Sequence, residues 1–344
     1  MIAAGPDARA GKVRAPVAPT IQDVLDVLQV TFPFFALVLC GYVAARRRML
    51  PLEAIAGLNT FVLFFALPCL LYRFGAGTPV AQLLDGAALA VYLPCALLMV
   101  AGTIAFTRNG RIGWNDASFG ALVAAFPNTG FMGVPLLVAL LGDAAAGPAI
   151  LTILVDLLVT SSLCIALSRL DSADQHGAAQ AMRRALRGVA ANPMPWAIAL
   201  GGLSSALGLT LPKPVNATVG LLAEAASPVA LFTIGAVLAR SQRLAAAQEH
   251  APKPAADFVP VAVAKLVAHP ALVYAVGRGA LAFGLPLDRF ALAVMTLVAA
   301  VPSASNVSLL AERFGADTGR IARIILLTTA AAFLTFSAAV ALVR

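Results

Sequence analysis

Two short stretches, AFPNTGFMGVP at residues 125–135 and AVPSASNVS at residues 300–308, decide how this chain folds. Each lies in a long apolar run and places a proline, Pro127 or Pro302, before small polar residues. A proline inside a helix removes one backbone hydrogen bond and clashes with the preceding turn. In lipid, the freed carbonyl groups must be satisfied by protein, water or a ligand. We therefore predict that both helices are interrupted near the middle of a bilayer.

The composition around these stretches is that of a membrane protein. Of the 344 residues, 60% are hydrophobic and only 12% are charged, with a mean hydropathy of +0.90. Soluble domains carry about 25% charged residues, and a chain this apolar could not cover its surface with polar groups. A spanning helix needs about 20 apolar residues. The runs of that length are 24–45, 53–74, 81–106, 116–141, 147–169, 192–210, 215–239, 257–283, 289–312 and 319–343.

These runs are too long and continuous for barrel strands, which alternate in segments of about 10 residues. The predicted fold class is therefore all-α, a polytopic membrane protein with ten transmembrane helices. Residues 1–20 are rich in Ala, Pro, Gly and Arg and have no apolar core, so they are not a signal peptide. We interpret them as a disordered N-terminal tail or an overlong start.

The positive charges lie mainly on one side of the predicted bundle. The loops after the odd-numbered runs hold 15 Lys and Arg residues, and the opposite side holds five. The positive-inside rule then places the odd-numbered loops in the cytoplasm and both termini on the periplasmic side of a bacterial inner membrane. The net charge of +8 is explained by this asymmetry, so no nucleic acid partner is expected.

The prolines also indicate an internal repeat. Pairs recur in the same order at offsets of 160, 176 and 175 residues: Pro68 with Pro228, Pro94 with Pro270, and Pro127 with Pro302. Two halves of five helices each must insert with opposite orientations, and inverted repeats are typical of transporter folds. The predicted organisation is a tail at 1–20, a first five-helix repeat at 21–170, a cytoplasmic loop at 171–191 and a second five-helix repeat at 192–344.

The two interruptions define the candidate site. If they face each other, half-helix N-termini with free N–H groups meet at mid-membrane and favour an anion. The predicted break residues are Pro127, Pro135 and Pro302, and the predicted substrate-binding residues are Asn128, Thr129, Gly130, Ser303, Ser305, Asn306 and Asn59. The alternative is a pair of ordinary proline kinks in which Ser and Gly allow close helix packing. Asn59 could equally bond across helices.

Ionisable residues inside spans are costly and usually functional. Asp156, Glu224 and Lys265 are candidates for coupling or support. Lys265 could pair with a carboxylate and respond to protons, donate to freed carbonyls, or extend towards the cytoplasm. For Asp156 and Glu224, a structural hydrogen bond is an equal alternative to a coupling role.

Four segments resemble the auxin efflux carrier family, which includes PIN-like proteins and bacterial malonate permeases. They are the segment 59–71, PNTGFMGVPL at 127–136, KLVAHP at 265–270, and VPS at 301–303 with 312–317 after it. The resemblance spans residues 24–343 and implies two inverted five-helix repeats whose fourth and ninth helices cross at their breaks. It also implies a moving transport domain beside a scaffold, an elevator mechanism and carriage of organic anions. The stretch Ser-Ala-Ser-Asn at 303–306 and the short central loop depart from the plant carriers, so the substrate is not carried over.

The sequence thus predicts a secondary transporter of small organic anions, such as malonate-like carboxylates, and not an enzyme. No ATP-binding Gly-x-x-x-x-Gly-Lys-Ser/Thr motif occurs, and the cysteine and histidine spacing suits no metal, so no cofactor is expected. Partners are the anion and the bilayer, and a homodimer is left open. The alternative is a cation-coupled symporter or sodium/proton antiporter of related fold, and a membrane-embedded enzyme or sensor is a third interpretation.

Overall fold

The computed structural model describes residues 21–170, 183, 187, 190–247 and 254–343, and the regular secondary structure of this part of the chain is helical apart from one isolated β-bridge. The predicted tail at 1–20 and most of the predicted loop at 171–191 lie outside the described residues. The elements are α1 Ile21–Arg46, α2 Leu52–Phe61, η1 Val62–Ala66, α3 Leu67–Gly77, α4 Val80–Leu83, α5 Gly86–Thr107, α6 Trp114–Ala125, η2 Thr129–Gly133, α7 Val134–Leu141, η3 Asp143–Ala145, α8 Ala146–Val155, η4 Asp156–Thr160, α9 Ser161–Leu167, α11 Pro193–Leu207, α12 Lys213–Ala247, η5 Ala255–Asp257, α13 Val259–Val263, η6 Ala264–Ala268, α14 His269–Ala282, α15 Arg289–Ala300, α16 Val307–Arg313 and α17 Thr318–Val343.

Within the described residues, seven helical segments are long and apolar enough to cross a membrane. They are Gln29–Arg46, Leu52–Gly77, Val80–Thr107, Asp143–Leu167, Lys213–Arg240, Val259–Ala282 and Thr318–Ala341. This confirms the all-helical, polytopic class. The other three predicted spans are shorter for visible reasons. The runs 116–141 and 289–312 are interrupted, and the run 192–210 forms α11, which has 15 residues.

Most prolines in the spans, apart from Pro127 and Pro302, do not break their helices. Pro68, Pro135 and Pro270 each follow a π-helical segment, η1, η2 or η6. A proline has no N–H for the carbonyl one turn earlier, and the residue before it donates five residues back instead, as Leu67 N does to Val62 O. This wider turn keeps the helix continuous. Pro127 and Pro302 have no such turn before them.

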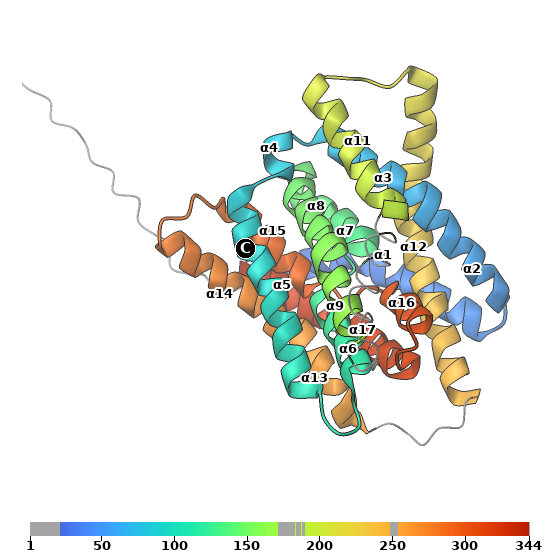
Figure 1. The fold of residues 1–344 in the computed structure, drawn as a ribbon. Helices are drawn as coiled ribbons and strands as arrows, with labels where there is room; N and C mark the ends of the chain where they lie inside the picture. The colour runs from blue at the N-terminus through green and yellow to red at the C-terminus, as the bar shows by residue number, and fades with distance from the viewer. Residues whose placement is uncertain (1–20, 171–182, 184–186, 188–189, 248–253, 344) are drawn as a thin grey trace, which may run out of the picture.

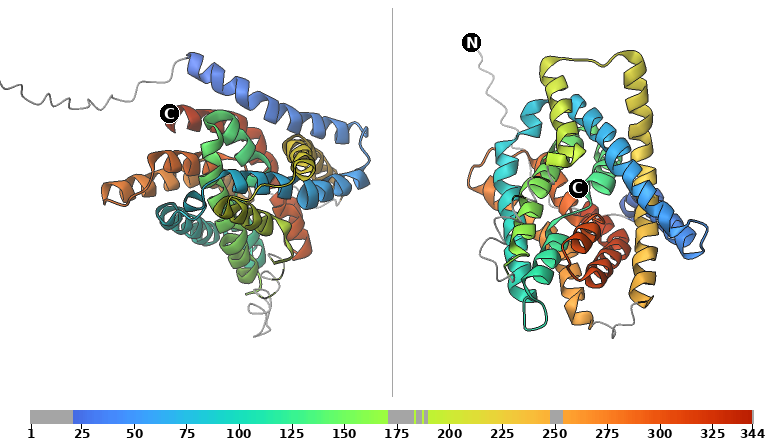
Figure 2. Two further views of the ribbon diagram at one scale, coloured as in Figure 1. Left: turned by 90° about the horizontal axis from the view of Figure 1, so that it is seen from above. Right: turned by 45° about the vertical axis from the view of Figure 1, so that its right-hand side comes forward.

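The helices form two groups that lie side by side (Figure 1). In the first group, the long helix α12 packs along α1 and against α2–η1–α3, and α11 packs on α3. In the second group, α5, α6, α8–η4–α9, α13–η6–α14, α15 and α17 pack mainly on one another. Two further views place α12 and α14 on opposite sides of the molecule (Figure 2). The interrupted segments belong to the second group, but they also touch the first group, because η2 contacts α12 and α3 and α7 contacts α1.

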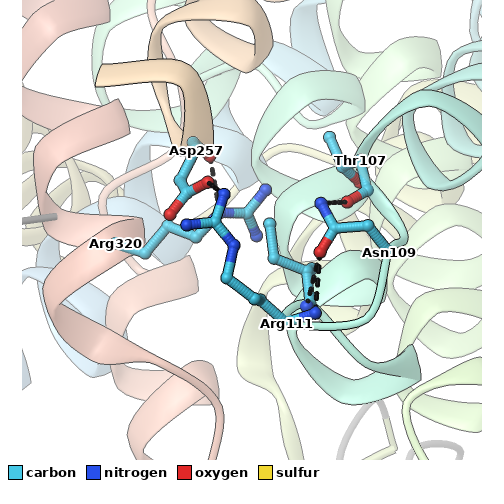
Figure 3. A network of polar contacts seen from close by, with 6 residues as sticks. Thr107, Asn109, Arg111, Asp257 and Arg320 are labelled. Atoms are coloured by element: carbon cyan, nitrogen blue, oxygen red, sulfur yellow. Dashed lines mark hydrogen bonds and ion pairs between the residues drawn. The ribbon is translucent and has the colours of Figure 1, made fainter. Parts of the chain in front are cut away.

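A buried arginine joins three elements at one end of the second group (Figure 3). Arg320 in the first turn of α17 is 2% exposed, and its Nε donates to the carbonyl oxygen of Asp257 at 2.7 Å. Its Nη1 donates to the carbonyl oxygen of Asp116 in α6, also at 2.7 Å. Arg111 reaches the Asp257 carboxylate from the loop after α5, at 3.4 Å. The Arg320 guanidinium therefore fixes the start of α6 relative to α17.

Candidate functional site at the paired helix breaks

The two interruptions pair with each other through the backbone. Asn128 N donates to Pro302 O at 2.8 Å, and Ala304 N donates to Phe126 O at 3.0 Å. Pro127 and Ser303 are opposite one another in a single antiparallel bridge between these bonds. In this geometry the two central residues exchange no hydrogen bond themselves, so a proline, which has no N–H, fits there at no cost.

Two further backbone groups freed by the breaks find partners in neighbouring helices. Ser303 N donates to Thr328 Oγ1 of α17 at 3.3 Å. The carbonyl oxygen of Ala299, near the end of α15, accepts from Lys265 Nζ at 2.6 Å. Backbone polar groups must be paired inside the bilayer, so these contacts stabilise the non-helical backbone of the breaks at membrane depth.

A cavity lies against the paired breaks, with about 320 Å³ of space not filled by atoms, part of it open to solvent. One wall is the segment 126–131, together with Ala304 and Asn306 from the other break. Ile153 and Leu157 of α8–η4 form a second wall. The first helix group closes the cavity with two residues, Leu67 of α3 and Met194 of α11. The cavity therefore lies where the two helix groups meet, and no charged side chain is among its lining residues.

The predicted site residues divide into three sets. The first lines the cavity and comprises Pro127, Asn128, Thr129, Gly130 and Asn306. The second is Pro302, Ser303 and Ser305, which are buried at or beside the bridge but do not line the cavity. Pro135 lies within α7, and Asn59 lies in α2, outside the lining. The structure thus brings together both breaks but not Asn59.

Two hydroxyl groups at the crossing are left without a hydrogen-bond partner. Thr129 Oγ1 and Ser303 Oγ are both buried, and neither has a partner among the described residues. Orphaned buried polar atoms are rare in native proteins, so these hydroxyls are candidates to bond a ligand or a water molecule. Thr129 is the stronger candidate of the two because it also lines the cavity.

The ionisable candidates lie in different environments. Lys265 and Asp156 are both fully buried, in η6 and η4 respectively. Lys265 does not extend towards solvent but holds the Ala299 carbonyl, the second of its three predicted placements, and its role in transport stays a prediction. Glu224 forms an ion pair with Arg73 at 3.7 Å, and both side chains are more than half exposed. Glu224 is therefore exposed and paired with a different residue, unlike the two buried candidates.

Sequence reasoning missed several residues of the site. Tyr92 in α5 donates from its hydroxyl to Asp156 Oδ2 at 3.0 Å. Its polar tip two residues before Pro94 was the available signal, because a buried tyrosine hydroxyl needs a partner. Leu67 and Met194 line the cavity through long-range packing, for which the local sequence gives no signal.

Paired helix breaks inside a bundle of apolar spanning helices define a polytopic membrane transporter. The sequence model for the membrane transport protein family matches residues 26–340, and the chain belongs to this family, which includes the auxin efflux carriers. It is 28% identical over 324 residues to a Rhizobium meliloti (strain 1021) protein named "Putative malonate transporter", covering 93% of this chain and 96% of that protein. It is 26% identical to the uncharacterized transporter YfdV of Escherichia coli (strain K12), covering 83% and 88% of the two chains. Auxin efflux carrier component 8 of Arabidopsis thaliana is 23% identical over 65% of this chain and 75% of its own length.

Proposed function

We propose that this protein is a secondary transporter of small organic anions, with the substrate carboxylate held at the paired breaks. The observation that carries the proposal is the cavity lined by both breaks and by neutral donors, without any charged side chain. Its lining includes Asn128, Thr129 and Asn306. Malonate-like carboxylates are the substrates we propose first, because a relative matched over 93% of the chain bears the name "Putative malonate transporter".

The backbone supports an anion over a cation. The segment η2–α7 starts at Thr129, and its first intrahelical donors are Met132 N and Gly133 N, which bond to Asn128 O. The N–H groups of residues 129–131 precede them and have no intrahelical acceptor. Such groups, with the positive end of the helix dipole, favour negative charge. A cation would need oxygen ligands, and no carboxylate lines the cavity.

We further propose ten spans arranged as two inverted five-helix repeats, 21–170 and 192–344. On this interpretation α6–η2–α7 and α15–α16 are the fourth and ninth spans, and α11 is the core of the sixth. The cavity at the boundary between the two helix groups supports an elevator mechanism. The group carrying the breaks would move as a unit past α3 and α11, alternately exposing the anion to each side.

The membrane setting follows from the charge distribution. We propose a multi-pass protein of the bacterial inner membrane with both termini on the periplasmic side, because 15 of the Lys and Arg residues lie in odd-numbered loops. The partners are the anion and the bilayer, with a homodimer left open. Membership of a family of membrane transporters supports a carrier without enzymatic activity.

The proposal is tested in two stages with purified full-length protein. First, thermal unfolding is measured with a panel of short mono- and dicarboxylates, because a ligand that binds the folded state raises the apparent melting temperature. Second, uptake of labelled malonate is measured in proteoliposomes. We expect stabilisation by at least one dicarboxylate and saturable uptake. No stabilisation by any carboxylate, with no uptake, would contradict the proposal.

The cation-coupled alternative is not favoured at the breaks. Its ion site would need acidic residues beside them, and the nearest in sequence, Asp143 and Glu312, are exposed and do not line the cavity. Uptake that required sodium would nevertheless revive it.

A further inference from the structure

We propose that the buried cluster of Asp156, Tyr92, Lys265 and His269 is a proton-binding site, and that a proton entering it accompanies the anion through the membrane. The inference deepens the proposed function and rests on it for the coupling, but the existence of the proton site can be tested separately. All four side chains are fully buried. They come from α5, η4, η6 and α14, which meet in the second helix group.

The geometry leaves the two charged groups without a direct ion pair. Asp156 accepts from Tyr92 Oη at 3.0 Å and from Thr160 Oγ1 at 3.1 Å. Lys265 Nζ donates to Ala299 O at 2.6 Å and lies 3.4 Å from His269 Nδ1. No ion pair within 4.0 Å joins Asp156 to Lys265 in the described part of the chain. Buried charges without a close partner are costly, and a proton that neutralises one of them removes that cost.

The surroundings restrict where the proton can go. The ionisable groups that face Asp156 are Tyr92 from α5, Cys164 from α9 and Lys265 from η6, while Cys95 of α5 faces Tyr92 and His269 of α14 faces Lys265. The charge that acts on Lys265 is that of Asp156. When His269 accepts a hydrogen bond at Nδ1 from the Lys265 ammonium, the proton of its neutral ring is on Nε2. This Nε2 is buried without a hydrogen-bond partner in the described residues. Asp156 is thus the group that gains or loses a proton, with Lys265 as its counter-charge.

Two π-helical turns hold this pair. Asp156 begins η4 and Lys265 lies in η6, and single π-helical turns of this kind frequently occur at functional sites. η6 is explained by Pro270, which follows it. η4 has no proline after it, and within this turn the Thr160 hydroxyl donates to the Asp156 carboxylate.

The cluster is connected to the anion cavity by two elements. Leu157, next to Asp156, lines the cavity from the same turn of η4. On the other side, the Lys265 ammonium bonds to Ala299, three residues before the break at Pro302. An ammonium with a carboxylate gives the cluster no net charge, and an ammonium with a carboxylic acid gives it one positive charge. That charge stabilises an anion at the breaks through a medium of low dielectric constant.

Linkage makes this effect reciprocal. If protonation of Asp156 strengthens anion binding, the bound anion must raise the proton affinity of the cluster by the same factor. The proton leaves the outer solution, binds a carboxylate oxygen of Asp156, and is released with the anion on the inner side. The carrier then returns empty and deprotonated, so no other reactant is needed.

The proton site is tested first without any substrate. Infrared difference spectra of the full-length protein between low and high pH report protonated carboxyl groups. We expect a carbonyl band that disappears in Asp156→Asn and persists in Asp143→Asn, a matched change at an exposed position. If Asp156→Asn does not fold, Asp156→Glu must shift the same band. A band unchanged in both Asp156 variants, or no titrating band in the wild type, would overturn the site.

Coupling is tested with malonate as the probe, over a pH range in which malonate stays a dianion. We expect affinity to increase roughly tenfold as Asp156 is protonated, within the approximately 5- to 150-fold span of typical coupling. An imposed pH gradient should drive malonate accumulation in the wild type and in Asp143→Asn, and at least tenfold less in Asp156→Asn. Accumulation that is equal in all three variants would refute coupling. If malonate does not bind at all, the substrate assignment fails while the infrared result stands.

Discussion

Asn128 and Pro302, 174 positions apart in the sequence, are joined by a backbone hydrogen bond of 2.8 Å. The donor precedes the first turn of η2, and the acceptor is the proline that ends α15. Because Ala304 N returns a bond to Phe126 O, each break satisfies the other. This relationship explains why two proline-interrupted helices are stable inside a bilayer, and why removing one break would leave the other unsatisfied.

The pairing predicts a specific disulfide. Pro127 and Ser303 face each other in the antiparallel bridge, without hydrogen bonds to one another. Such pairs have Cα atoms about 4.5 Å apart, within the range that a disulfide spans. In a chain whose four native cysteines are replaced, Pro127→Cys with Ser303→Cys should cross-link within one chain on mild oxidation. Mass spectrometry of the linked peptides measures this. The pair Asn59→Cys with Ser303→Cys should remain reduced, and the reverse pattern would contradict the pairing.

The breaks themselves were predictable because proline chemistry is local. Pro127 and Pro302 each stand before small polar residues in an apolar run, and nothing else in the chain repeats that pattern. The orientation of the breaks towards each other was an inference from symmetry. The π-helical turns, in contrast, could not be predicted, because a helix can also accommodate a proline by kinking.

The site was predicted only in part, because local proline chemistry is visible in the sequence and packing between distant helices is not. Asn128 and Thr129 belong to the break and were found with it, whereas Leu67 and Met194 reach the cavity from helices distant in sequence. Asn59 was selected as a polar residue in a span, but polarity alone does not fix which face of α2 meets the cavity. The number of spans stays a prediction, because α11 has only 15 described helical residues.

The two asparagines at the cavity should be needed for anion transport. Asn128→Ala and Asn306→Ala each remove neutral donors from the lining. A hydrogen bond to a charged group contributes about 1.5–3 kcal/mol, so malonate affinity should fall roughly 10- to 150-fold. Uptake in proteoliposomes and thermal shift with malonate measure the loss. Asn216→Ala, an exposed asparagine in the first turn of α12, is the matched control and should behave as the wild type. Undiminished uptake in both cavity variants would exclude this site.

Thr129→Val should change stability and binding in opposite directions. Its hydroxyl is buried without a partner, so an isosteric methyl group should stabilise the ligand-free protein by about 1–3 kcal/mol. The same change removes a donor from the cavity and should weaken malonate binding. Melting temperatures with and without malonate measure both effects. Thr328→Val is the control, because its hydroxyl accepts from Ser303 N and donates to Ile325 O, and its loss should destabilise.

Arg320→Lys should loosen the end of the bundle where α6 begins. The guanidinium donates from separate nitrogens to the carbonyls of Asp257 and Asp116, and a single ammonium cannot reproduce that fork. Losing one charged hydrogen bond to a buried carbonyl should cost about 1.5–3 kcal/mol. A fall in melting temperature measures this. Arg323 lies on the same helix as Arg320, and its guanidinium is over the ring of Phe258. Arg323→Lys should therefore lower the melting temperature much less.

The contact between α1 and α12 should tolerate no added side-chain atom. A Cβ at Gly41 would overlap the carbonyl oxygen of Phe232, and a Cβ at Gly235 would overlap that of Val38. Neither obstacle is a flexible side chain, so the two helices would have to separate. Overpacking of this kind costs about 1–3 kcal/mol or more. Gly41→Ala should therefore lower the melting temperature of the purified protein.

Gly102→Ala in α5 is the control. A Cβ there meets no atom within 4 Å, and the change should raise the melting temperature slightly, since alanine favours helix by about 0.5–1 kcal/mol over glycine. Equal melting temperatures for the two variants would mean that α1 and α12 are not in close backbone contact, and that the first helix group is not the rigid scaffold an elevator mechanism requires.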